Sequence, residues 1–192
     1  MKFFMLYMLG DLKNRELCQL SRLPHGMGLK WLRLANGTSA KEYYPQDATI
    51  HMSTDEGYGI KLSSFIGHVS GILVLHKDVI DVIKEYAVNA DIEYFPFNLI
   101  NPKGRVHSSD YFIVNPLGSV DCLCHKRSKF KTKGGVIRGV EHFVFDVSKT
   151  DNLPPIFRVK EELDNYFFRQ DLVHAFEAKG FTNFVFNEVE VK

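Results

Sequence analysis

Cysteine is scarce in this chain, with Cys18, Cys122 and Cys124 the only three in 192 residues. An odd number without regular spacing does not make a disulfide framework, so a reduced, cytoplasmic setting fits better than secretion. The best metal candidate is the run from Cys122 to His125, but zinc sites normally use four ligands and paired C-x-x-C spacing. We therefore expect no metal here and buried or half-buried strand cysteines instead.

Long apolar runs are also missing. No run approaches the ~20 residues that a membrane-spanning helix needs, so no membrane partner is expected. The opening run from Phe3 to Leu9 is short and is followed by Asp11, without a small-residue cleavage pattern. We interpret it as a buried first strand rather than a signal peptide.

A strong net charge is absent too. The formal charge is +1, which argues against a protein that binds nucleic acid over its whole surface. The charge is nevertheless uneven, since Pro102 to Val140 has eight Lys/Arg and two Asp. Glu141 to Lys192 has six Lys/Arg and ten Asp/Glu. Two solvated faces are the simpler explanation, and a surface that steers one charged partner is the alternative.

Catalytic motifs are lacking as well. The sequence has no phosphate loop, no Gly-x-Ser-x-Gly, no His-Glu-x-x-His and no dinucleotide fingerprint. His51 and His68 flank Asp55 and Glu56, but nothing in the sequence brings these four together. We therefore expect neither an enzyme nor a cofactor.

Aromatic residues are abundant, with 16 Phe and 8 Tyr, and hydrophobic residues make up 45% of the chain. Such a composition supports a real core and favours strands. The clearest pattern is a strand at Gly71–Leu75, an amphipathic helix at Lys77–Asn89 and a strand at Ile92–Leu99. Pro96 cannot donate to a ladder, so we place that last strand at an edge or at a bulge.

A similar unit closes the chain. It comprises a strand at Asn165–Phe168, a helix at Gln170–Lys179 and a strand at Phe181–Val191. A loose helix is expected at Leu12–Leu23, and a surface loop at Ser39–Gly59. Further predicted elements are strands at Tyr111–Val114, Ser119–Leu123, Glu141–Val147 and Ile156–Val159, and a basic hairpin or loop at Lys126–Gly135.

Together these patterns predict an α+β fold of mixed, mostly antiparallel sheets covered by a few amphipathic helices. Two similar strand-helix-strand units lie in its C-terminal two-thirds. Residues 1–70 form a strand and loop-rich region packed against an α+β domain at residues 71–192. We expect the two parts to make one compact unit.

Four features between about Gly71 and Val189 resemble a known family. They are "GILVLHKDVIDVIKEY", "DYFIVNPLGSVDCLCHKRS", the run Ile156-Phe157-Arg158, and "FFRQDLVHAFEAKGFTNFVFNEV". Their order and spacing resemble the immunity proteins of bacterial polymorphic toxin systems. This family was formerly a domain of unknown function, the myxobacterial-type immunity domain. The resemblance implies a non-enzymatic protein that is encoded beside a cognate toxin and neutralises it by contact.

The resemblance also marks structural positions at Asp121, Ser128, Phe157 and Arg158. Two of these, Asp121 and Arg158, are charged residues inside apolar strands. Because a buried carboxylate without a partner is very costly, we hypothesise that these two side chains pair.

Aromatic and charged side chains in exposed segments are the candidates for partner binding. They are Tyr43, Tyr44, Asp55, Glu56 and Tyr58 in the irregular stretch, and Lys129, Phe130 and Lys131 in the basic hairpin. Other functions stay open: an adaptor or regulatory binding domain, or a small module that binds single-stranded nucleic acid on the basic hairpin. A homodimer through the strand edge at Pro96 stays open as well.

Overall fold

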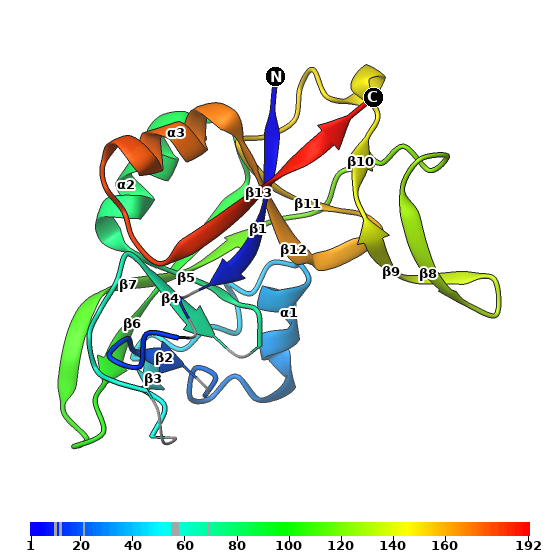
Figure 1. The fold of residues 1–192 in the computed structure, drawn as a ribbon. Coiled ribbons are helices and arrows are strands. Elements are labelled where there is room, and N and C mark those ends of the chain that lie inside the picture. The colour runs from blue at the N-terminus through cyan, green and yellow to red at the C-terminus, as the bar shows by residue number, and fades with distance from the viewer. Residues whose placement is uncertain (10, 12, 21, 55–57, 69) are drawn as a thin grey trace.

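The computed structural model describes the chain apart from residues 10, 12, 21, 55–57 and 69, and it has the predicted α+β fold (Figure 1). One mixed sheet has five strands in the order β10-β13-β1-β12-β11. Its strands are β1 Phe3–Leu9, β10 Val144–Phe145, β11 Ile156–Val159, β12 Glu162–Arg169 and β13 Phe184–Val191. All of its pairs are antiparallel except β10 with β13.

A second mixed sheet has six strands in the order β2-β4-β5-β7-β6-β3. Its strands are β2 Gln19–Leu20, β3 Thr49–His51, β4 Phe65–His68, β5 Leu73–His76, β6 Ile92–Ile100 and β7 Val106–Pro116. The short strands β2 and β3 pair in parallel with β4 and β6 at its two edges. Residues 1–70 therefore contribute strands to both large sheets.

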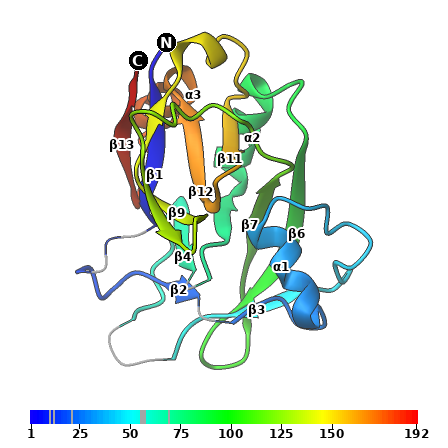
Figure 2. The same cartoon turned by 90° about the vertical axis from the view of Figure 1, so that its right-hand side faces the viewer.

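A separate two-stranded sheet and the helices complete the described elements. The strands are β8 Lys129–Lys133 and β9 Val136–His142. The helices are α1 Leu32–Ala35, α2 Lys77–Tyr86 and α3 Gln170–Ala178, with 3-10 turns η1 Gly28–Trp31 and η2 Val147–Lys149. Figure 2 shows β1, β12 and β13 as neighbouring strands of the five-stranded sheet.

The two predicted strand-helix-strand units have the same topology. In the first, β5 and β6 both pair antiparallel with β7, which lies between them. In the second, β12 and β13 both pair antiparallel with β1. Each helix therefore joins two parallel strands that are separated by a third strand. The central strand of the second unit comes from the other end of the chain.

Helices α2 and α3 pack against each other and share one core (Figure 1). Their apolar faces are buried, as the helical spacing predicts. The buried residues are Val79, Ile80, Val82 and Ile83 on α2, and Leu172, Val173 and Phe176 on α3. Residues from both sheets contribute to this core, among them Leu73 and Phe168. The helix pair therefore links the two sheets.

Both helices have an aspartate in the first turn beside the side chain of the N-cap residue, but only the His76 side chain of α2 accepts a hydrogen bond from the helix backbone. His76 is the N-cap of α2, and its ring lies 3.3 Å from the carboxylate of Asp78. Arg169 is the N-cap of α3 and donates from Nη2 to Asp171 at 2.7 Å. A carboxylate in the first turn also interacts favourably with the positive end of the helix dipole. The arginine holds the pKa of the Asp171 carboxyl below its usual value.

Some predicted elements were wrong. The described part of Leu12–Leu23 contains turns and the short β2 in place of a helix, because Cys18 and Leu20 are buried against the six-stranded sheet. Ser119–Leu123 makes only isolated bridges, through Val120 and Leu123.

The prediction for Pro96 was confirmed. The parallel strand β3 reaches only Asn98–Ile100, and the β6–β7 register shifts just after Phe97. Pro96 thus lies beyond the reach of β3, and its carbonyl accepts a hydrogen bond from the Tyr44 hydroxyl at 3.0 Å.

A buried arginine holds the N-terminal region to the five-stranded sheet. Arg158 on β11 is 1% exposed. Its guanidinium donates to the carbonyls of Leu34 and Ala35 at the end of α1, each at 2.8 Å, and to the Leu163 carbonyl. It also donates to the Tyr166 hydroxyl at 2.9 Å and lies over the Tyr166 ring. Backbone carbonyls at a helix end are favourable partners for a cation.

The hydroxyl of Tyr166 extends this contact to the other sheet. It accepts a hydrogen bond from the backbone N–H of Leu73 on β5 at 3.2 Å. One hydroxyl thus bonds a residue of the six-stranded sheet and Arg158 of the five-stranded sheet. Burial raises the pKa of this phenol, so the hydroxyl stays neutral at pH 7.

The predicted Asp121–Arg158 pair was wrong. Asp121 is exposed and accepts a hydrogen bond from Lys149 at 2.7 Å, which lowers the pKa of its carboxyl. The hypothesis assumed that Asp121 is a buried carboxylate that needs a charged partner. Asp121 is exposed instead, and carbonyl oxygens accept the hydrogen bonds from Nη1 and Nη2 of Arg158.

A glycine lets the chain approach this arginine closely. Gly37 has a φ of +69°, and its carbonyl accepts from Gly118 N–H at 2.8 Å. A Cβ at Gly37 would lie 2.9 Å from the Gly118 oxygen and 3.0 Å from Cδ of Arg158. Gly118 has a similar φ of +72°, but a Cβ there would meet no atom within 4 Å.

Replacement of Arg158 by Met should lower the free energy of unfolding by about 3 kcal/mol or more, since several buried hydrogen-bonding groups lose their partner. Arg138→Met on the exposed face of β9 is the matched control and should cost under about 0.5 kcal/mol. Urea unfolding of the two variants checks this. Equal midpoints would show that Arg158 does not have this structural role.

Gly37→Ala and Gly118→Ala should separate backbone strain from crowding. Both place a side chain in the left-handed region, at a cost of roughly 1–2 kcal/mol. Only Gly37→Ala adds steric overlap, which costs about 1–3 kcal/mol more. Thermal melting should therefore place Gly37→Ala well below Gly118→Ala, and the reverse order would contradict the packing described here.

Candidate functional site

The most prominent exposed element is the hairpin β8–β9, which projects from the body of the molecule (Figure 1). Lys133 pairs with Val136, so Gly134 and Gly135 form a two-residue turn. Their φ values of +61° and +77° are both positive. Such a turn matches the right-handed twist of the two strands, and glycine adopts it without steric cost.

Side chains alternate along β8. Lys129, Lys131 and Lys133 are exposed, as expected for every second residue of a strand. Phe130 points the other way. Its ring is half-buried against a hydrophobic cluster that includes Val140 and Phe145. The predicted trio Lys129, Phe130 and Lys131 is therefore divided between two faces, with the lysines outward and the aromatic ring inward.

Two adjacent glutamates brace the hairpin from the β11–β12 turn. Glu162 accepts a hydrogen bond from the backbone N–H of Val140 at 2.7 Å. Glu161 lies 2.6 Å from the ring nitrogen of His125, and that ring lies 5.1 Å from the ring of Phe130. Because Phe130 pairs with Val140, both contacts fix the base of the hairpin to the five-stranded sheet.

Sequence reasoning missed this bracing, because Glu161 and Glu162 are about twenty or more residues from their partners and carry no local motif. It also left Lys133 out of the site. The alternation of lysines at every second position would have included it.

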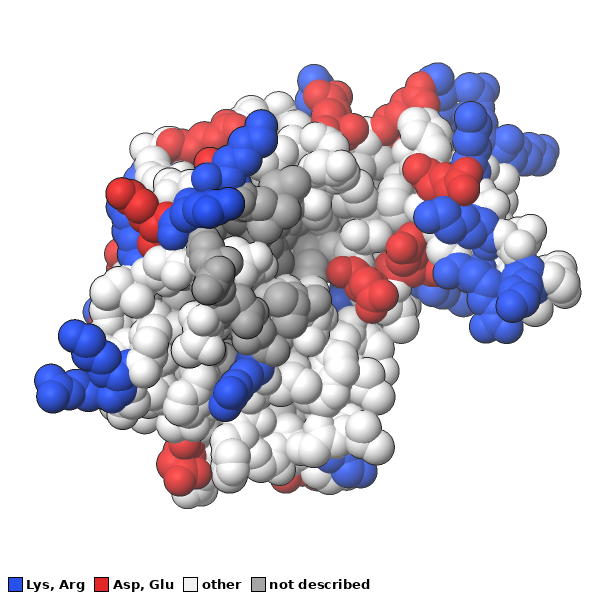
Figure 3. Space-filling view, turned by 60° about the horizontal axis from the view of Figure 1, so that its bottom comes forward, with Lys and Arg blue, Asp and Glu red and all other residues white. Residues whose placement is uncertain are grey.

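Positive charge is concentrated on this part of the chain. Residues 126–138 contain six Lys/Arg and no Asp/Glu. They are Lys126, Arg127, Lys129, Lys131, Lys133 and Arg138. Within the part of the chain that the structure describes, none of the six has a carboxylate within 4.0 Å. Figure 3 shows Lys and Arg side chains gathered at the right-hand end, where the hairpin projects in Figure 1.

The other predicted surface lies beside the six-stranded sheet. Tyr43 is 40% exposed, and the cations of Lys30 and Arg33 lie 4.7 and 5.0 Å from its ring centre. Tyr44 instead stacks on Phe95 at 4.4 Å. Burial raises the pKa of the Tyr44 phenol, which stays neutral at pH 7. Of the other predicted residues, Tyr58 is 39% exposed, and Asp55 and Glu56 fall outside the described residues.

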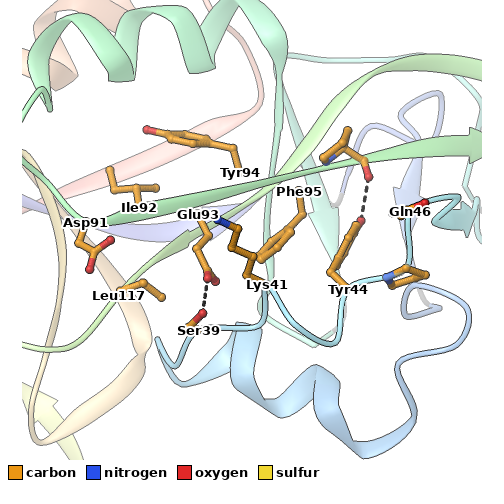
Figure 4. A pocket seen from close by; sticks show the side chains of 12 residues that line it. Ser39, Lys41, Tyr44, Gln46, Asp91, Ile92, Glu93, Tyr94, Phe95 and Leu117 are labelled. Atoms are coloured by element: carbon orange, nitrogen blue, oxygen red, sulfur yellow. Dashed lines mark hydrogen bonds between the residues drawn. The ribbon is translucent and has the colours of Figure 1, made fainter.

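A cavity of about 650 Å³ opens between the segment at residues 39–46 and β6 (Figure 4). Glu93 lines this cavity. Its carboxylate accepts hydrogen bonds from the Ser39 hydroxyl, from the Ala40 N–H at 2.9 Å and from the Asn115 side chain at 3.1 Å. Tyr44 closes one end through its bond to Pro96. These hydrogen bonds hold the segment at residues 39–46 to β6, so we assign these polar groups a structural role.

The predicted structural residues Ser128 and Phe157 have clear contacts. The Ser128 hydroxyl donates to the Val144 carbonyl and accepts from the Val144 N–H, both at 3.1 Å. These two hydrogen bonds fix the residue before the hairpin to β10. Phe157 stacks on Phe167 at 5.7 Å and meets Phe3 edge-on at 6.0 Å.

The cysteines are packed as small apolar groups. Cys18 and Cys122 are buried, and burial raises the pKa of each thiol to about 12. Cys124 is half-buried. Among the described residues, no group of three or more His, Cys, Asp and Glu side chains is arranged to hold a metal ion.

A comparison with protein families gives one match, the Immunity protein family (Imm11), over residues 20–191. The chain belongs to the Imm11 family. The Imm11 match begins well before Gly71, so it includes α1 and its contact with Arg158. Proteins of this family are typically not enzymes. No curated protein matches the chain. None of the described helices is long and apolar enough to cross a membrane.

Loss of the Glu162 brace should loosen the hairpin without unfolding the molecule. In Glu162→Ala, the Val140 N–H loses its acceptor, so amide exchange across Lys129–His142 should rise about tenfold. Asp164→Ala, an exposed change on the same strand, is the control and should leave exchange in the hairpin unchanged. Hydrogen exchange with mass spectrometry measures both, and equal protection would show that Glu162 does not brace the hairpin.

Proposed function

We propose that this chain binds a cognate bacterial toxin and neutralises it by direct contact. The match to the Imm11 family over residues 20–191 carries the proposal. Membership of an immunity family implies toxin neutralisation as the biological role, and the contact mode is our inference from the surface.

The surface supports direct contact because it offers a braced, exposed element. The hairpin is fixed by Ser128, Glu161 and Glu162, so its lysines are held in place before a partner arrives. A surface that is already ordered loses less conformational entropy on binding. A specific complex needs about 800 Å² on each partner. The hairpin with its flanking cations is a natural centre for such an area.

The test is protection of a bacterial host. The polypeptide encoded next to this chain is expressed alone, with this chain, and with an unrelated protein of similar size. We expect growth to stop in the first and third cultures and colony counts to recover by a hundredfold or more in the second. Equal killing in all three cultures would overturn the proposal.

A second measurement separates neutralisation by contact from an indirect effect. The two purified proteins are mixed, and size-exclusion chromatography is compared with loss of the toxin's own activity. We expect co-elution and inhibition at matching ratios. Protection in cells without co-elution would mean that this chain acts as an adaptor or regulator, which would contradict direct contact.

A further inference from the structure

We infer that the basic face of the β8–β9 hairpin docks on an acidic surface of the toxin. This inference rests on the proposed function and goes further, because it names the chemistry of the partner's surface. The basic face is defined here by Lys129, Lys131 and Lys133 together with Lys126, Arg127 and Arg138. The first observation is that these six cations lack a carboxylate within 4.0 Å among the described residues.

Elsewhere in the described chain, six of the eighteen other Lys and Arg side chains have a carboxylate within 4.0 Å. Lys2, Lys77 and Lys149 lie 2.7–2.9 Å from Glu188, Asp110 and Asp121. Two carboxylates at and just before the start of β12 contact the region of the hairpin. Glu161 is directed to His125, and Glu162 accepts from the backbone N–H of Val140. Glu161 and Glu162 thus hold the hairpin in place, and the exposed Glu141 on β9 has no cation within 4.0 Å among the described residues. Like charges without a counter-charge repel one another, so six cations within residues 126–138 raise the energy of the free protein.

The geometry gives this charge a flat, accessible face. Lys129, Lys131 and Lys133 lie on one side of β8 because strand side chains alternate. Lys131 lies opposite Gly139 on β9, where a Cβ would be 3.8 Å from Cδ of Lys131. Gly139 itself is buried, and the Glu162 carboxylate oxygens would lie 3.9 Å from the same Cβ. The three lysines are exposed, so a partner surface can approach their ammonium groups, and close approach strengthens an ionic contact.

Two other uses of these lysines fit the contacts less well. Lysine on an exposed strand also blocks unwanted strand pairing, but this does not account for Lys126, Arg127 and Arg138. Single-stranded nucleic acid is held by cations and by aromatic rings that stack on bases. Phe130 is the one aromatic ring in residues 126–138, and it is turned inward against His125. An acidic protein surface needs only the cations.

The test compares two charge reversals of equal size. Lys129→Glu/Lys131→Glu changes the basic face, and Lys103→Glu/Arg105→Glu changes exposed residues in the β6–β7 turn. Binding to the purified product of the neighbouring gene is measured by biolayer interferometry at 50 and 300 mM NaCl. We expect the association rate constant at low salt to fall at least tenfold for the first variant and less than twofold for the second. The salt dependence should also weaken in the first variant only.

The outcomes separate the two levels of the proposal. Failure of the unchanged chain to protect the host would overturn the proposed function itself. The variant Lys129→Glu/Lys131→Glu could still protect the host fully and bind the neighbouring gene product at an unchanged rate. This result would leave the proposed function intact and overturn the acidic docking surface. Binding of a fluorescent 20-nucleotide single strand that is lost in this variant, with toxin binding retained, would overturn it too. If the variant melts early, the neutral pair Lys129→Gln/Lys131→Gln replaces it, with an expected loss of threefold or more.

Discussion

The buried guanidinium of Arg158 is the constraint on which the arrangement of this molecule depends. It joins the end of α1 to the β11–β12 hairpin, and through the Tyr166 hydroxyl it reaches β5 of the other sheet. A buried cation is costly without hydrogen-bond partners, so the bonds from Nη1 and Nη2 favour one arrangement of α1, the five-stranded sheet and β5, although the buried Nε has no partner among the described residues. Apolar packing alone would permit small shifts between the sheets, whereas four directed bonds to fixed oxygen atoms do not.

The same geometry explains where the β8–β9 hairpin lies. The β11–β12 strands that carry Arg158 and Tyr166 are joined by the turn that holds Glu161. Glu162 begins β12 and bonds the hairpin strand β9. The position of the basic face is therefore set by the strands that contact the arginine. A short chain of contacts therefore runs from the buried Arg158 to the exposed lysines of the hairpin.

Local patterns allowed much of the fold to be predicted. The helix at Lys77 and the helix at Gln170 have apolar spacing that only one buried face explains, and both were confirmed. The strand Gln19–Leu20, inside the helix predicted at Leu12–Leu23, was missed because it pairs with Gly67 and His68, far away in sequence. The Asp121–Arg158 pair was wrong for the same reason. Charge complementarity can be proposed from sequence, but the carbonyls of Leu34 and Ala35 become partners only when the chain is folded. Of the candidate site, the exposed lysines follow from alternation, whereas the inward turn of Phe130 and the bracing glutamates depend on tertiary contacts.

The position of β1 in the five-stranded sheet has a consequence for the order of folding. This strand occupies the centre of the second unit, between two strands that lie more than 150 residues downstream. During synthesis, β1 therefore lacks both of these partners until β12 and β13 have left the ribosome. Contacts at such large sequence separation form slowly, since the intervening loop must be closed first. The five-stranded sheet is completed only after β13 has been made. A prematurely terminated chain would leave an apolar strand exposed to aggregation and proteolysis.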